Sequence, residues 1–149
     1  MTAPRRRMRM RDKLVLRVVS KALVPYILLF ALYVQFHGDF GPGGGFQAGV
    51  IFAAGLILYG LIFGLPTLQR VVPFIVVEAS VAIGLLLYAG VGVATVLLGG
   101  AFLDYRVLDA HDATQGLHLG ILLVEFGVGL AVAGAMLVIF YAFAGRRSD

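Results

Sequence analysis

The sequence contains no cysteine and no tryptophan, and only 13% of its 149 residues are charged. Without cysteine, the chain cannot form disulfides, iron–sulfur clusters or thiolate zinc sites. A soluble domain carries nearer to a quarter charged residues, whereas this chain is 60% hydrophobic. Without tryptophan, any aromatic belt at a membrane interface relies on tyrosine and phenylalanine. The composition therefore predicts a single-domain protein that crosses a membrane several times.

Basic residues are concentrated near the N-terminus. Eight of the twelve lysines and arginines lie in residues 1–21, and between Lys21 and Arg146 only Arg70 and Arg106 are basic. A sequence pI near 9.8 is found in many nucleic-acid-binding domains. A basic cluster beside a long hydrophobic run is typical of membrane topology instead. We therefore expect the lipid bilayer, and no nucleic acid, as a partner.

Four stretches are long enough to cross a bilayer, which takes roughly 20 mainly apolar residues. They run from about Leu14 to Phe36, Phe46 to Leu65, Val71 to Leu98 and Leu117 to Phe143. The first is too long for the apolar region of a signal peptide, and no cleavage site of small residues is evident. The predicted fold is all-α, with four transmembrane helices over residues 14–145 between a basic tail (1–13) and a short tail (146–149).

The distribution of charge also predicts an orientation. Four crossings place both termini on one side, and if that side is the cytoplasm, eleven basic residues lie inside and Arg106 alone lies outside. The positive-inside rule favours this arrangement, with both termini cytoplasmic. The external connection near Gly99–Gly116 has a net charge of −2 with His111 neutral, and we interpret it as a solvated loop.

Residues 37–50 read His-Gly-Asp-Phe-Gly-Pro-Gly-Gly-Gly-Phe-Gln-Ala-Gly-Val, between the first two apolar runs. We call Pro42–Gly45 the glycine segment. The spacing of Gly43, Gly45 and Ala48 matches a dinucleotide fingerprint, but a membrane-length run precedes it and no acidic residue follows about 20 positions later. The Lys-Ser/Thr pair of a P-loop is absent as well. Nucleotide binding is therefore rejected.

The same residues have a structural interpretation. Pro42 fixes its own φ angle and the glycines accept conformations closed to other residues, which predicts a tight external turn into the second helix. Gly45, Gly49 and Ala53 then form a face of small residues suited to close helix contact. Unblocked amides of Gly43 and Gly44 near the helix start are able to hold an anion or a partner's carbonyl.

Two carboxylates fall within the predicted spans. Glu78 lies roughly 10 Å from the start of the third span, and Glu125 lies roughly 12–15 Å into the fourth. Carboxylates at such depth are costly and usually face protein or water. His118 precedes Glu125 by seven residues and projects from nearly the same helix face. We name Glu125, Glu78 and His118 as candidates for a proton or cation path, with a structural hydrogen bond as the alternative for Glu125.

The opposite face of the fourth span carries glycine every seven residues, at Gly120, Gly127 and Gly134. We interpret this side as the contact with another helix. His37, His111 and His118 do not have the spacing of metal ligands, and no nucleophile–base pair is evident. We therefore expect no metal, no cofactor and no enzymatic chemistry.

His37-Gly38 and Pro42-Gly43-Gly44-Gly45-Phe46-Gln47, at the start of an apolar helix, resemble the MnhB domain, a small component of the multisubunit Mrp-type sodium/proton antiporter family. Leu23–Phe30 and Glu125–Val128 are similar to the family's first and last spans, so the resemblance covers about residues 14–145. It assigns Pro42–Gln47 and Gly49 to the family motif and to helix packing.

The resemblance implies a small component of a prokaryotic plasma-membrane assembly that exchanges sodium for protons. Its implied partners are other antiporter subunits, including large ones similar to the proton-pumping subunits of respiratory complex I. No central lysine occurs in the spans, which favours a structural and coupling role. The alternatives are an equivalent subunit of a membrane-bound hydrogenase-like or other respiratory complex, and a stand-alone channel or scaffold.

Overall fold

The computed structural model describes residues 14–38, 42–109 and 111–146. These ranges are helical and contain no strand, with α1 (Leu14–His37), α2 (Gly45–Phe63), α3 (Leu65–Val71), α4 (Phe74–Leu97), a 3-10 helix η2 (Tyr105–Leu108) and α5 (Ala113–Gly145). Helices α1, α2, α4 and α5 are long and apolar enough to cross a membrane. This confirms the predicted all-α fold with four spans. The expectations for residues 1–13 lie outside the described residues.

Two predicted boundaries were wrong by a few residues. The third span was expected to begin at Val71, but α3 ends there and α4 begins at Phe74. Pro73 separates them as an extended N-cap, because proline has no N–H to continue a helix and disfavours helical geometry at the preceding residue. The last span was expected to begin at Leu117, but α5 begins four residues earlier, at Ala113. Asp112 caps it there, because its carboxylate accepts a hydrogen bond from Thr114 N at 2.8 Å.

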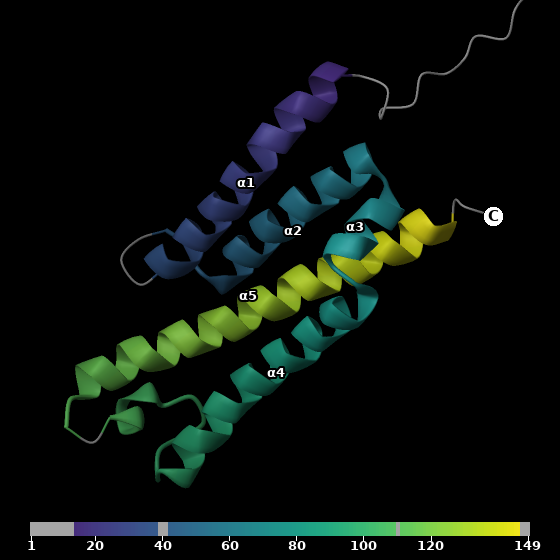
Figure 1. The fold of residues 1–149 in the computed structure, drawn as a ribbon. Helices are drawn as coiled ribbons and strands as arrows, with labels where there is room; N and C mark the ends of the chain where they lie inside the picture. The colour runs from purple at the N-terminus through teal and green to yellow at the C-terminus, as the bar shows by residue number, and fades with distance from the viewer. Residues whose placement is uncertain (1–13, 39–41, 110, 147–149) are drawn as a thin grey trace, which may run out of the picture.

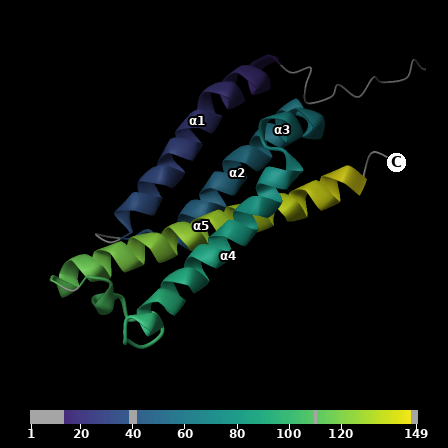
Figure 2. The same cartoon turned by 60° about the horizontal axis from the view of Figure 1, so that its bottom comes forward.

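The four long helices lie in the spatial order α1, α2, α5, α4 (Figure 1). Helix α5 thus lies between α2 and α4, the two long helices with which it makes most of its contacts. The view in Figure 2 shows α3 as a short segment at the end of the molecule where α2 ends and α4 begins. Leu56, Leu68, Val77, Leu137 and Tyr141 form a buried cluster there. The hydroxyl of Tyr141 donates to Val72 O at 2.8 Å, which ties α5 to the link between α3 and α4.

The contact between α4 and α5 depends on glycine. A methyl group on Gly84 would lie 2.5 Å from Gly127 O, and one on Gly134 would lie 3.0 Å from Val77 O. Gly120 packs against the ring of Tyr105 in η2. The predicted contact of the Gly120–Gly127–Gly134 side with another helix is thus confirmed for α4, with η2 extending it. Backbones this close gain many dispersion contacts, which drive helix association in a bilayer.

The start of α2 and the middle of α4 meet α5 at nearly the same level. Gly45 at the start of α2 packs on Glu125, and Gly84 near the middle of α4 packs on Gly127. From Glu125, α5 extends roughly a dozen residues back to Ala113, about 18 Å. Helix α2 therefore begins beside the central part of α5 rather than at its end (Figure 1).

The connection between α4 and α5 is anchored by Thr95, which is completely buried. Its hydroxyl donates to Gly92 O at 2.8 Å and accepts from Leu103 N at 3.0 Å. Leu103 has a positive φ of 64°, which is a strained conformation for a residue other than glycine with a bulky side chain. The connection therefore follows a defined path against α4 and α5, where the sequence had indicated an ordinary loop.

We predict that Thr95→Val destabilises the protein by about 1–2 kcal/mol, because it leaves the Leu103 amide without its acceptor. The measurement is the thermal midpoint of the detergent-purified protein, which should fall by several degrees. Thr114→Val is the control, because Thr114 is exposed and its hydroxyl makes no described contact with another element. Equal midpoints for the two variants would contradict the anchoring role of Thr95.

Candidate ion site at the start of α2

The glycine segment and Glu125 form one site. Gly45 packs directly on the backbone carbonyl of Glu125, so that any side chain at Gly45 would collide with it. The carboxylate of Glu125 extends along the glycines on either side of the turn: a methyl group on Gly38 would lie 2.7 Å from Oε2, and one on Gly44 would lie 3.2 Å from Oε1. The absence of side chains here creates the space that the carboxylate fills.

The sequence folds this way because of the backbone at Gly44. Gly44 is the N-cap of α2, with φ 131° and ψ 169°, and only glycine adopts this conformation without strain. Its N–H donates to Val34 O at 3.4 Å, and its carbonyl accepts from Ala48 N at 3.0 Å. These bonds join the last turn of α1 to the first turn of α2, as the predicted tight turn requires, while residues 39–41 of that turn lie outside the described residues.

The predicted face of small residues on α2 is confirmed. A methyl group on Gly49 would lie 2.5 Å from Gly129 O, and Ala53 is completely buried. Together with Gly45, these residues bring α2 and α5 into backbone contact. The same face thus determines where along α5 the glycine segment lies, and hence which residue of α5 meets it.

The electrostatics of the site suit a carboxylate. Helix α2 has no acidic residue in its first turn and no side-chain hydrogen bond at its N-cap. The first amides of a helix and its dipole attract negative charge, and here the carboxylate of Glu125 comes from a different helix. The sequence allowed an anion or a partner's carbonyl near Gly43 and Gly44; in the structure the Gly44 amide donates to Val34 O, and the carboxyl group of Glu125 lies beside Gly44.

Beside this contact lies a cavity of about 370 Å³, which we call the Glu125 cavity. It is lined by Gly43, Gly44, Gly45, Phe46, Gln47, Val124, Glu125 and Val128. Two of these side chains are polar, the amide of Gln47 and the carboxylate of Glu125. Most of the family motif and the strongest ion-path candidate therefore face one space, although they are about 80 residues apart in sequence.

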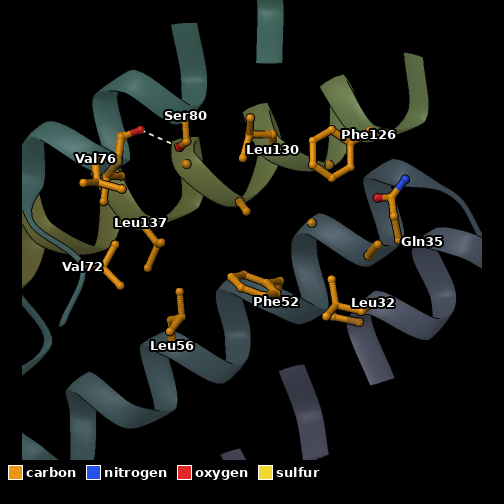
Figure 3. Close-up of a pocket in the computed structure, with 17 residues that line it drawn as sticks. Leu32, Gln35, Phe52, Leu56, Val72, Val76, Ser80, Phe126, Leu130 and Leu137 are labelled. Atoms are coloured by element: carbon orange, nitrogen blue, oxygen red, sulfur yellow. Dashed lines mark hydrogen bonds between the residues drawn. The ribbon is translucent and has the colours of Figure 1, made fainter. Parts of the chain in front are cut away.

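A second cavity, of about 400 Å³, is apolar (Figure 3). It lies between the α1–α2 hairpin and α4, against α5, and its lining includes no acidic, basic or histidine side chain. Ser80 in its wall donates to Val77 O at 2.7 Å. Gln35 at one end is 5% exposed, and its Nε2 has no hydrogen-bond partner among the described residues. This cavity has no group that could carry a proton or hold a cation by charge.

The other two candidates lie apart from this site. Glu78 is exposed on α4, near Ser80, which packs on Gly134 about 14 Å along α5 from Glu125. His118 is also exposed, about 10 Å along α5 from Glu125 toward Ala113. The structure therefore joins Glu125 to the glycine segment, keeps His118 on the adjoining part of α5, and separates Glu78 from both.

The polar groups of the α4–α5 connection have structural partners. Asp109 accepts from His111 N at 2.8 Å and Asp112 N at 3.2 Å, and Asp104 accepts from Arg106 N at 3.4 Å. Burial, with a smaller contribution from Tyr88, raises the pKa of Tyr105 above its ordinary value, so this phenol stays neutral near pH 7. Within the described residues, no group of three His, Asp or Glu side chains is placed to hold a metal ion.

The fold and this site define a multi-pass helical membrane protein with a carboxylate at an interhelical turn. A family model described as a domain related to the MnhB subunit of Na+/H+ antiporters matches residues 15–138. The mnhB2 antiporter-subunit homologue of Staphylococcus haemolyticus is 34% identical over 139 residues, which cover 92% of this chain and 98% of the relative. That of Staphylococcus aureus (strain Newman) is 31% identical with the same coverage. The chain belongs to the MnhB family, as its glycine motif had indicated.

We predict that Gly45→Ala prevents stable packing of α2 on α5, because the new methyl group collides with the carbonyl of Glu125. The expected result is loss of the folded protein from the membrane fraction, measured by quantitative immunoblot of a tagged chain. Gly90→Ala on α4 is the matched control, since a methyl group there meets nothing within 4 Å. Normal amounts of the Gly45→Ala protein would show that the backbone contact is dispensable.

Proposed function

We propose that this chain is the MnhB-type membrane subunit of a multisubunit sodium/proton antiporter, in which Glu125 belongs to the path of protons or cations. Membership of the MnhB family and four apolar spans support the first part. The relatives are named as subunits of an antiporter, so the chain functions as a component of a transporter. The observation that carries the second part is the position of the Glu125 carboxylate at the glycine segment.

Two properties suit Glu125 to this role. Its carboxylate faces a cavity together with Gln47 and glycine backbone, so small ions and water have room beside it. It also lies at the start of α2, where the helix dipole favours the charged form. Depth in the membrane opposes the charge. A carboxylate held between such opposing influences is suited to change its protonation when sodium binds or leaves.

His118 and Glu78 have lesser roles in this proposal. His118 lies on α5 between Glu125 and the α4–α5 connection and is suited to relay protons along that stretch. Glu78 is exposed near the start of α4. Because an exposed carboxylate in a span is unfavourable against lipid, we propose that Glu78 faces a neighbouring protein of the assembly and contributes to the path only if that protein continues it.

The proposed setting is the prokaryotic plasma membrane, with both termini in the cytoplasm. The excess of basic residues in the N-terminal region, at Arg70 and at the C-terminus supports this orientation. Many large apolar side chains of α1 and α4 are exposed, including Tyr26, Leu29, Ile75 and Leu86. Lipid and the large complex-I-like antiporter subunits are the proposed partners for these surfaces, and the absence of a lysine in the middle of the spans supports a coupling role.

We predict that Glu125→Gln lowers sodium-dependent proton exchange at least ten-fold, because the amide keeps the shape of the carboxyl but cannot release a proton. Exchange is measured in membrane vesicles by a pH-sensitive dye after a sodium pulse. Glu78→Gln is the comparison, with a smaller loss expected.

Co-purification in mild detergent must show that each variant still assembles with its partner subunits. Unchanged exchange in both assembled variants would remove the carboxylates from the ion path, leaving the chain with a structural role. Co-purifying nickel–iron hydrogenase subunits would instead assign the chain to a different complex.

A further inference from the structure

We propose that water reaches Glu125 through the Glu125 cavity from the end of the molecule that carries the α4–α5 connection, and from that end only. This inference rests on the proposed ion-path role for its purpose, whereas the water access itself is measured separately. It assigns the site an aqueous entrance, with α5 residues before Glu125 as its wall. Protons and sodium would then exchange between Glu125 and the solution on that side.

The glycine segment lies deep along the helix bundle. Gly45 packs on Glu125, and two residues further along α5, Gly127 packs on Gly84 near the middle of α4. The non-helical backbone before α2 therefore lies level with the middle of a membrane-spanning helix. In a bilayer, such backbone is tolerated only where protein buries it or where it lines a water-filled cavity. Gly43 and Gly44 line a cavity of about 370 Å³, which is large enough for several water molecules.

The Glu125 cavity has polar groups in its lining. A carboxylate and an amide side chain face it, beside the backbone of three glycines. Lipid tails offer no hydrogen bonds to these groups, and a carboxylate in contact with lipid is strongly unfavourable. The apolar cavity on the other side of α5 provides the contrast, since its lining holds no charged residue. Of these two cavities, only the Glu125 cavity is suited to water.

The Glu125 cavity opens in one direction along α5. Toward α3, the route along α5 is closed, because Gly49 packs on Gly129 and Gly60 packs against Phe140. Toward the α4–α5 connection, α2 no longer covers α5, because α2 begins at Gly45. The α5 side chains before Glu125 are exposed at Gln115, His118, Leu119 and Leu122. Among the described residues, the face of this stretch that η2 does not pack on therefore joins the cavity to the end of the molecule that carries the acidic connection.

The absence of cysteine from the sequence allows a direct test in the assembled complex. Leu122→Cys places a thiol on the proposed route, and Val93→Cys places one at a similar depth on the outer side of α4. Both positions are exposed in the chain, at 40% and 53%. Asp109→Cys marks the side of the α4–α5 connection, and Gln47→Cys is a second position on the route should Leu122→Cys fold poorly.

The probe is a membrane-impermeant, positively charged methanethiosulfonate, applied separately to intact cells and to inverted vesicles. A gel shift of the tagged chain with a polymer-linked maleimide counts the thiols that remain. Thiols react as thiolates, which form in water and not in hydrocarbon. We expect Leu122→Cys and Gln47→Cys to react at least ten-fold faster than Val93→Cys, and only from the side that labels Asp109→Cys.

Two results would overturn the proposal: rates at Leu122→Cys and Gln47→Cys no faster than at Val93→Cys, or labelling from the side opposite Asp109→Cys. Failure of the ion-path role has a different signature. In that case Glu125→Gln retains exchange, while Leu122→Cys still labels as expected. Conversely, exchange that depends on Glu125 without labelling at either route position would leave the ion-path role standing and remove this entrance.

Discussion

The backbone contact between Gly45 and the carbonyl of Glu125 determines most of the remaining structure. It places the first residue of α2 against the central part of α5, and it thereby sets the depth of the turn that joins α1 to α2. Because Gly45 has no side chain, the two helices approach closely enough for Gly49 to meet Gly129 one turn further on. The Glu125 side chain is then directed along the glycines before α2. Position, depth and chemistry of the site follow from one contact.

Helix α5 makes close glycine contacts on two sides, and the two sides have different consequences. Toward α4, Gly127 and Gly134 pack on Gly84 and on Val77 and bring the two backbones into contact. Toward α2, the small residues come mainly from the partner helix, so α5 is free to carry a carboxylate at Glu125. The absence of side chains thus supports packing on one side and leaves room for a charged group on the other. The long α5 serves both contacts over the same stretch, and it continues beyond the start of α2 to pack on η2.

Much of the architecture could be predicted from the sequence. The length of the apolar runs gave the number of spans, and the repeats Gly45–Gly49–Ala53 and Gly120–Gly127–Gly134 indicated which faces pack closely. The break at Pro73 was also readable, because proline ends hydrogen bonding along a helix. The apolar run alone nevertheless placed the start of the third span at Val71, before this break.

The pairing of these faces could not be predicted. A stripe of small residues shows that a helix approaches closely, but it does not identify the partner. The sequence indicated ion chemistry at Glu125 and Glu78 rather than at the glycine segment, whereas the structure makes Glu125 and the glycine segment a single site and places Glu78 elsewhere. Gln35, a buried amide at the end of an apolar helix, was not singled out at all, although a lone glutamine in such a run is a readable signal.

In the proposed function, Glu125 beside the glycine segment changes its protonation when the antiporter exchanges ions. Infrared difference spectroscopy of the purified complex measures this directly, by comparing spectra before and after sodium is added at constant pH. We expect a protonated-carboxyl band to disappear when sodium is added to the native complex, and we expect no such change in Glu125→Gln. An identical band change in the variant, or no carboxyl change in the native complex, would contradict it.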